Sequence, residues 1–269
     1  IDFEWDVPAA RETWQEVLQL ATELKHEGWV NRARGDLGMI AFLQGDSRQA
    51  RAMVGQALQT AAKTSDVGGQ LRYLGAIRAG LLLAGDPPAA LGYADKAISV
   101  AMQQPDVGFL YPAHSTKILA LLALDRVNEA QQLVDVALKH AFSERSRIKQ
   151  VELLMMAATI ARQRGREDES LSRIEQAAQI AKAGGVQRLL GEADAERSSI
   201  YRRRGDLARA LESARSAVLA TKAAGSRWDL PQQLQAQAAS EAALGKPPEA
   251  ERTYEEAQDV IVGTMLNGP

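Results

Sequence analysis

The sequence has no cysteine, few aromatic residues and no long apolar run, and each absence excludes a class of protein. Without cysteine there is no disulfide, no thiolate metal site and no cysteine nucleophile. No apolar run approaches the roughly 20 residues of a membrane-spanning helix, so no membrane insertion is expected in this segment. A formal net charge of −2 argues against a nucleic-acid partner, which would require a strong basic excess. No secretory signal peptide opens the sequence. The absence of cysteine leaves the compartment open, and a cytoplasmic location is favoured.

What dominates the sequence is a repeat of 40 residues, most clearly seen in the stretch 205–217. Each copy has a turn residue followed by small residues five and twelve positions later. The turn column reads Gly45, Gly85, Asp125, Gly165, Gly205 and Gly245. The column five later reads Ala50, Ala90, Ala130, Ser170, Ala210 and Ala250, and the column twelve later Ala57, Ala97, Ala137, Ala177, Ala217 and Ala257. A fixed period of this length predicts a solenoid in which each unit packs on its neighbours.

The repeat predicts an all-α superhelix of six helix pairs preceded by a single N-terminal helix. Apolar residues at helical spacing before Glu27 indicate that first helix. The first helices of the pairs are expected at 29–44, 70–84, 110–124, 148–164, 188–204 and 230–244, and their partners at 47–63, 87–103, 127–141, 167–183, 207–223 and 247–263. In this register the N-terminal helix is the second half of a repeat. Residues 1–269 are therefore interpreted as one superhelical domain within a longer protein.

The turns within the pairs have the residues that such turns need. A glycine can take the left-handed conformation that closes the first helix, and Asp125 can take it at some cost. The aspartates Asp46, Asp86 and Asp206 can accept the leading N–H groups of the second helix. The glycine pairs 68–69 and 184–185 are interpreted as helix ends, because no GK[ST] follows them as it would in a phosphate loop.

On these residues the chain resembles the tetratricopeptide repeat (TPR) family, whose signature is matched by Gly205, Ala210 and Ala217. The family also has a small residue seven positions before the turn, which Arg78 and Ile118 replace here, implying looser packing of the second and third units. The family's usual period is about 34 residues. The longer period here is similar to arrays in bacterial signalling proteins, including transcription activators. The stretch 254–269 also resembles the junction that precedes a caspase-like (CHAT) domain.

In TPR arrays the concave wall is formed by the residues 13, 10, 6, 3 and 2 positions before the turn glycine. Carried onto this chain, these columns give an apolar and a charged set of candidate ligand-binding residues. The apolar set is Met39, Phe42, Leu43, Leu82 and Leu83, and the charged set is Glu152, Arg162, Glu192, Arg202 and Arg203. The resemblance thus implies a groove for a protein or peptide segment of acidic or amphipathic character.

Other interpretations of both sets stay open. The apolar set can be covered by the N-terminal helix or by the curvature of the array, because monomeric proteins seldom expose large apolar patches. The arginines can be a solvated and screened face, although an anionic ligand would relieve repulsion between Arg162 and Arg202. The column nine before the turn lacks the asparagine of the family's carboxylate clamp, which argues against chaperone tails as ligands.

No catalytic constellation is evident, and neither a metal nor a cofactor is expected. His26, His114 and His140 lie far apart in the sequence and outside metal-ligand spacing. The sequence therefore predicts a non-enzymatic scaffold that binds a peptide or protein segment in its concave groove. The alternative is a regulatory or oligomerising sensor region of a larger bacterial signalling protein, such as a kinase, a transcription activator or a caspase-like protein.

Overall fold

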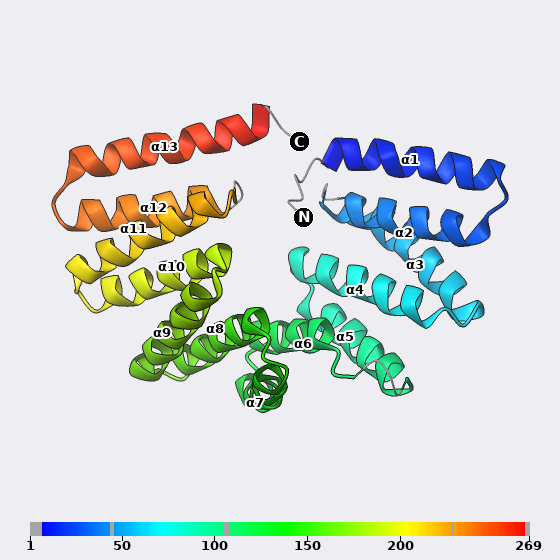
Figure 1. Ribbon diagram of the computed structural model, residues 1–269, viewed down its shortest axis with the longest axis horizontal. Helices are drawn as coiled ribbons and strands as arrows, with labels where there is room; N and C mark the ends of the chain where they lie inside the picture. Colours follow the sequence, from blue (N-terminus) through cyan, green and yellow to red (C-terminus); the bar gives the residue numbers. More distant parts are fainter. Residues whose placement is uncertain (1–6, 44–45, 105–107, 227–228, 267–269) are drawn as a thin grey trace. The chain divides into compact units, whose positions relative to one another are not determined.

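The computed structural model describes residues 7–43, 46–104, 108–226 and 229–266 of the 269-residue chain. These residues form thirteen α-helices and no strand (Figure 1). The helices are α1 (Val7–Glu23), α2 (Glu27–Leu43), α3 (Ser47–Lys63), α4 (Val67–Leu83), α5 (Pro87–Met102), α6 (Tyr111–Ala123), α7 (Val127–Ser143), α8 (Arg147–Gln163), α9 (Glu167–Gly184), α10 (Gln187–Arg203), α11 (Leu207–Ala223), α12 (Leu230–Ala243) and α13 (Pro247–Leu266). The expected all-α array, with one N-terminal helix and six pairs, is therefore confirmed.

The chain divides into two compact units. Unit 1 comprises residues 1–133 and unit 2 residues 134–268, so the division falls within α7. In unit 1 a buried cluster of alanine, leucine, isoleucine, valine and tyrosine joins α3, α4 and α5. A corresponding cluster in unit 2 joins α8, α9 and α10. Each unit thus has its own core, built mainly from small and aliphatic side chains as the composition predicts.

The turns between helices follow a regular pattern of left-handed residues. Within the pairs these are Gly85, Gly165, Gly205 and Gly245, with φ between 72° and 76°, and Asp125, with φ 56°. Between the pairs they are Lys25, Ser65, Arg145, Gly185 and Gly225, and also Gly108 in the longer connection between α5 and α6. Apart from Gly108, these positions are separated by 20 residues or a multiple of 20, because most helices have 17 residues and most turns have three. The structural step is therefore a single helix, half the period of the sequence repeat. Gly45 lies outside the described residues.

The predicted aspartate caps are present. Asp46, Asp86 and Asp206 each accept a hydrogen bond from the backbone N–H three residues later, at 2.9–3.2 Å. Such a bond satisfies one of the N–H groups that a helix leaves without an internal partner at its start. These caps fix where α3, α5 and α11 begin.

The two glycine pairs have different roles. Gly185 is the left-handed cap of α9, as predicted, with φ 67°. The interpretation of Gly68 and Gly69 as a helix end is wrong, because both lie in the first turn of α4. There Gly69 donates its N–H to the Asp66 carboxylate at 2.8 Å, and a Cβ on Gly69 would lie only 2.2 Å from Asp66 Oδ2. The glycine is needed for this cap rather than for a turn.

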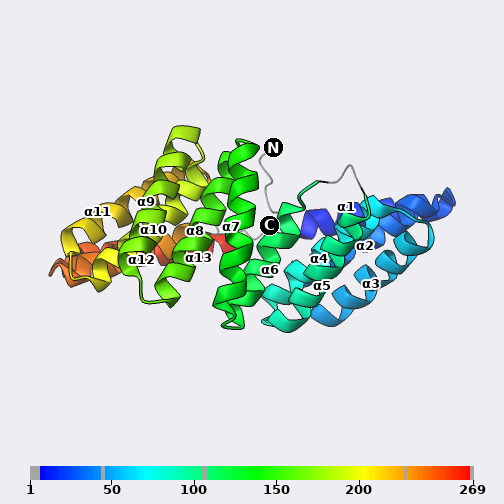
Figure 2. The same ribbon diagram turned by 90° about the horizontal axis from the view of Figure 1, so that it is seen from below.

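Within each unit the first helices of the pairs form an inner layer. In unit 1, α2 contacts α4 and α4 contacts α6, and in unit 2, α10 contacts both α8 and α12. The second helices of the same unit, such as α9 and α11, do not contact each other in the described part of the chain. The second helices α3, α5, α9 and α11 each pack instead between their own first helix and the next one, as Figure 2 shows for α3 between α2 and α4.

The small residues of the repeat are the contacts between these layers. Every residue in the columns five and twelve positions after the turn is at most 5% exposed. Small side chains let helices approach to the shorter end of the usual 8–10 Å separation of helix axes. The residues seven positions before the turn also point into the unit, including the two departures from the family pattern, since Ile118 and Arg78 are both buried.

Candidate functional site

The candidate wall residues all lie on first helices, but they belong to two different units. The apolar set lies on α2 and α4 of unit 1, and the charged set lies on α8 and α10 of unit 2. The structure therefore presents two separate inner-helix faces, each built from neighbouring helices that contact one another.

In unit 1 part of the apolar set is used in packing between neighbouring inner helices. Phe42 is half-buried, and a Cβ built on Gly80 of α4 would lie 2.5 Å from its ring. Leu82 packs against the same core cluster. Met39 remains 40% exposed. The side chains of Leu43 and Leu83 lie outside the described residues.

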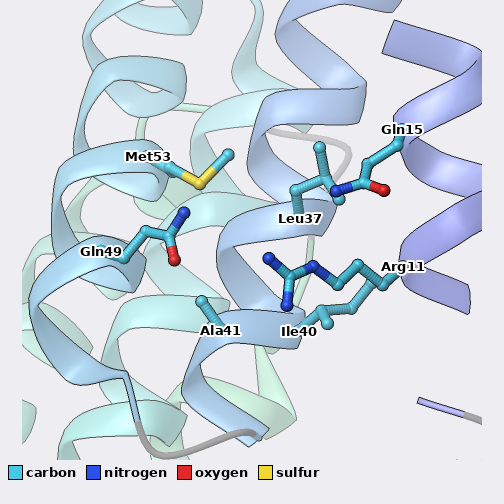
Figure 3. A pocket seen from close by; sticks show the side chains of 7 residues that line it. All are labelled: Arg11, Gln15, Leu37, Ile40, Ala41, Gln49 and Met53. Atoms are coloured by element: carbon cyan, nitrogen blue, oxygen red, sulfur yellow. The ribbon is translucent and has the colours of Figure 1, made fainter. Parts of the chain in front are cut away.

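The N-terminal helix covers a different side of α2 from the one that bears Met39. Arg11 and Gln15 of α1 face the buried residues Leu37, Ile40 and Ala41 of α2 (Figure 3). A cavity of about 50 Å³ remains between α1, α2 and α3. A cavity of this size has room for a few water molecules and is far below the roughly 300 Å³ of small ligand sites. It is part of the helix packing.

A larger hollow of about 340 Å³ lies in unit 1 where α2 and α4 begin and α3 ends. Trp29, Arg32, Arg72 and Tyr73 are among the residues that line it. Arg32 is already paired with Asp36 at 2.5 Å, and the Tyr73 hydroxyl donates to the backbone oxygen of Asn31 at 3.3 Å. Most of its polar groups therefore have partners within the chain.

In unit 2 carboxylates gather where the inner helices begin. Arg188 lies between Glu152 of α8, at 3.9 Å, and Glu192 of α10, to which it donates a short hydrogen bond. Burial raises the pKa of Glu192; Arg188 opposes this effect, whereas Asp229 and Glu152 add to it. This edge of the face is therefore acidic, with one guanidinium among three carboxylates.

The arginines of unit 2 lie where the same helices end, and they fall into two groups. Arg203 contacts Glu167 at 3.3 Å and Ser199 at 2.9 Å. Its charge is therefore compensated by the carboxylate of Glu167, the first residue of α9. Arg162 and Arg202 are exposed, and neither has an ion pair or side-chain hydrogen bond within the described part of the chain. Of the three arginines identified from the sequence, these two are available to a ligand.

Acidic and basic residues thus form two rows across unit 2. Ten residues separate Glu152 from Arg162 in α8, and ten separate Glu192 from Arg202 in α10. This separation is about 15 Å along an α-helix. The two helices contact each other, so residues within a row are about 10 Å apart. We refer to Glu152, Glu192, Arg162 and Arg202 as the charged face.

Sequence reasoning missed Arg188 and Asp229, which complete the electrostatics of the acidic row. Arg188 stands four residues before Glu192, a spacing that places two side chains on one side of a helix. That signal was present in the sequence. Asp229 is only brought near Glu192 by the packing of α12 on α10, which no local pattern reveals.

The described residues contain no group of three or more His, Asp or Glu side chains that could hold a metal ion. The histidines remain apart: His114 of α6 stacks on Phe109, which precedes that helix, with ring centroids 4.1 Å apart, and His140 is exposed on α7. Among the residues that the structure describes, no helix combines the length and apolar character needed to span a bilayer.

Several solved structures share this fold. A tetratricopeptide repeat protein from Parabacteroides merdae superposes with a TM-score of 0.65 at 17% identity, covering 96% of this chain and 88% of the other. The apo form of RapI gives 0.71 at 11% identity, covering 95% and 93%. The quorum sensor NprR from B. thuringiensis gives 0.63 at 18% identity, covering 96% and 77%. A second NprR structure, in complex with its cognate peptide NprX, gives 0.62 at 18% identity, covering 96% and 80%.

No protein-family model matches the sequence, and no curated protein matches it either. The similarity is therefore one of structure, and it confirms the TPR-like fold that the repeat predicted. At these identities the superpositions establish the architecture alone.

Proposed function

We propose that this protein is a non-enzymatic scaffold that binds a peptide or protein segment across the charged face of unit 2. The observation that carries the proposal is the pair of exposed arginines without partners, Arg162 and Arg202, on two inner helices in contact. Two like charges about 10 Å apart gain free energy when an anionic group lies between them. The NprR complex supports the proposal, because NprR, which shares this fold, is bound to its cognate peptide NprX in that structure.

The acidic row refines the character of this ligand. A purely acidic segment would be repelled by Glu152 and Glu192, which lie about 15 Å from the arginines. A segment with acidic side chains on one side and basic side chains on the other would satisfy both rows. A helical segment suits this geometry, because residues i and i+7 on one side of a helix are about 10.5 Å apart, close to the spacing of neighbouring inner helices.

The alternative role is that of a sensor region in a larger bacterial signalling protein. The likeness to the quorum sensor NprR favours it over an unrelated structural role. In that case the same face would bind a signalling peptide, and the rest of the protein would respond. The scaffold and the sensor hypothesis both require ligand binding at the charged face. They differ in the consequence of binding, because only a sensor region would alter the activity of the rest of the protein.

The test is selection of random peptides on the purified chain, followed by affinity measurements with the selected sequences. Selected peptides should carry both acidic and basic residues. The affinity of the selected peptides for the double variant Arg162→Glu/Arg202→Glu should be at least tenfold lower than for the wild type, and it should lose most of its salt dependence. Arg252→Glu is the control for each exchange, because Arg252 is exposed on the second helix α13. Equal affinity for the wild type and the double variant would rule out the charged face as the site.

The acidic row has its own test. Glu152→Lys should weaken binding of peptides that carry basic residues on one side, and should leave purely acidic peptides unaffected or bound more tightly. If Glu152→Lys changes neither class, the ligand does not reach the acidic row, and the proposal reduces to an acidic segment held by the arginines.

A further inference from the structure

Arg78 of α4 is a buried cation without a carboxylate partner. Arg78 is only 9% exposed, and its guanidinium forms no ion pair with any described residue. Burial lowers the pKa of Arg78, and among the described residues no carboxylate acts in the opposite direction. An arginine nevertheless keeps its charge in proteins. A buried charge without an opposite charge is costly, so this position differs from an ordinary helix contact.

Among the described residues, only one of the three guanidinium nitrogens of Arg78 has a hydrogen-bond partner. Nη1 donates to the backbone oxygen of Pro112 at 2.9 Å and to Thr116 Oγ1 at 2.7 Å, both on α6. Nε is buried and has no hydrogen-bond partner among the described residues. Nη2 donates no hydrogen bond to a described residue and is not fully enclosed. Because the protein encloses Nε, Nη2 is the unused donor that a ligand can reach, and a hydrogen bond from a guanidinium to a carboxylate is strengthened by the two charges.

Nη2 lies beside the inner-helix face of unit 1. Pro112 and Thr116 are 13 and nine positions before the turn residue Asp125, and Gly75 is ten positions before Gly85. Pro112 and Gly75 therefore occupy two of the columns that line the inner side of such arrays. A Cβ built on Gly75 would be 3.5 Å from Nη2, so the absence of a side chain on Gly75 leaves space for a ligand next to this donor.

We propose that Nη2 of Arg78 binds a carboxylate of a ligand that lies on the inner-helix face of unit 1. The carboxylate would supply the negative charge that the buried guanidinium lacks as a partner, and one of its oxygens would accept a hydrogen bond from Nη2. The exposed side chains of Met39 and Leu119 on the same layer provide apolar contacts for the residues of the ligand next to the carboxylate. The carboxylate can come from a peptide C-terminus or from an Asp or Glu side chain.

The inference rests on the proposed function only in the nature of the ligand, a peptide. The site itself belongs to unit 1, whereas the charged face belongs to unit 2. Small carboxylates can therefore test Arg78 independently of any peptide that the charged face selects.

The experiment follows the arginine Nε–H resonances of the full chain, labelled with ¹⁵N, by NMR. The Arg78 signal is identified by its loss in Arg78→Lys. N-acetylleucine serves as the probe for a free C-terminus, N-acetylglutamic acid α-amide as the probe for an acidic side chain, and N-acetylleucinamide as the uncharged control. The Arg78 signal should shift with at least one carboxylate and not with the amide, and the tighter of the two carboxylates identifies the source. An unmoved signal, or the same shift with the amide, would overturn the proposal.

Two variants separate binding from a structural role. Arg78→Met removes the donors at similar volume, and carboxylate affinity, followed on backbone amides of α4 and α6, should fall about 10- to 100-fold. Gly75→Val keeps Arg78 but places methyl groups against Nη2, and it should weaken binding in the same way, whereas Gly75→Ala should have a smaller effect. Unchanged affinity in a folded Gly75→Val variant would contradict the assignment even if Arg78→Met did not fold. Exchange of Arg162 and Arg202 should leave the Arg78 shift intact.

Discussion

The close approach of α2 and α4 predicts that Gly35→Ala destabilises the protein although alanine is the better helix former. Gly35 lies in α2, and a Cβ at this position would be 2.1 Å from Tyr73 Cε1, 2.8 Å from Cδ1 and 3.0 Å from Cζ. Favourable contacts between carbon atoms are about 3.5–4.0 Å. Tyr73 is 2% exposed and its hydroxyl is bonded to the backbone of α2, so the ring has little room to move.

The expected magnitude is a balance of two effects. An exposed Gly→Ala exchange inside a helix stabilises by about 0.5–1 kcal/mol. Forcing a methyl group into a packed interior costs about 1–3 kcal/mol. Gly35→Ala should therefore lower the free energy of unfolding by up to about 2 kcal/mol. Gly55 in the partner helix α3 is the matched control, because a Cβ there meets nothing within 4 Å. Gly55→Ala should raise the stability.

The assay is urea unfolding of both variants and the wild type, followed by circular dichroism. The two exchanges are chemically identical and lie in one helix pair of unit 1, so opposite signs can only come from their surroundings. The loss in Gly35→Ala should be smaller in a Tyr73→Ala background, with a coupling energy of about 0.5–3 kcal/mol. Equal stabilisation by both exchanges would show that α2 and α4 are not in the close contact described here.

Two further predictions concern single aspartates. Asp125→Gly should stabilise the protein by about 0.5 kcal/mol in thermal unfolding. A left-handed conformation costs a residue with a side chain about 1–2 kcal/mol, and the greater entropy of glycine in the unfolded state offsets part of this gain. A loss of stability would mean that the Asp125 carboxylate itself stabilises the turn. Burial raises the pKa of Asp194, with Ser216 and Arg197 opposing, so the folded state retains a proton that the unfolded state releases near pH 3.9. Stability from this group is therefore lost as pH rises above that value. The stability of Asp194→Asn relative to the wild type should accordingly increase as pH rises above about 4 in urea titrations; a difference independent of pH would contradict the direction of the shift.

The architecture could be predicted because it rests on residues that recur. A small residue, alanine in all but one case, recurs at two fixed positions after each turn and determines which side the second helices bury. An aspartate cap in three copies determines where α3, α5 and α11 begin. The 20-residue step of the turns was missed for a physical reason. Between the pairs the left-handed position is taken by Lys25, Ser65 and Arg145 as well as by glycine, so its residue type carries little signal.

The candidate site could be predicted only as a set of positions. The columns identified Arg162 and Arg202, but they could not show that Arg203 is paired with Glu167 of a helix 36 residues earlier. They also gave no indication that Phe42 packs against Gly80. Arg78 was noticed as a departure from the family pattern, and its unused donors became evident only from its contacts with α6. Pairings between helices depend on side-chain directions that periodicity does not contain.

The arrangement of the second helices has a mechanical consequence. Because α9 contacts both α8 and α10 but not α11, it acts as a spacer that sets the angle between two neighbouring inner helices. A ligand that joins Arg162 to Arg202 would tie α8 and α10 together on the opposite side of this spacer. Binding on the inner face would then compress the packing around Ala177 and Ala181, whose methyl groups are already fully buried. The outer surface of the array would therefore stiffen in response to an event on the inner surface, and slower amide exchange in α9 would be its sign.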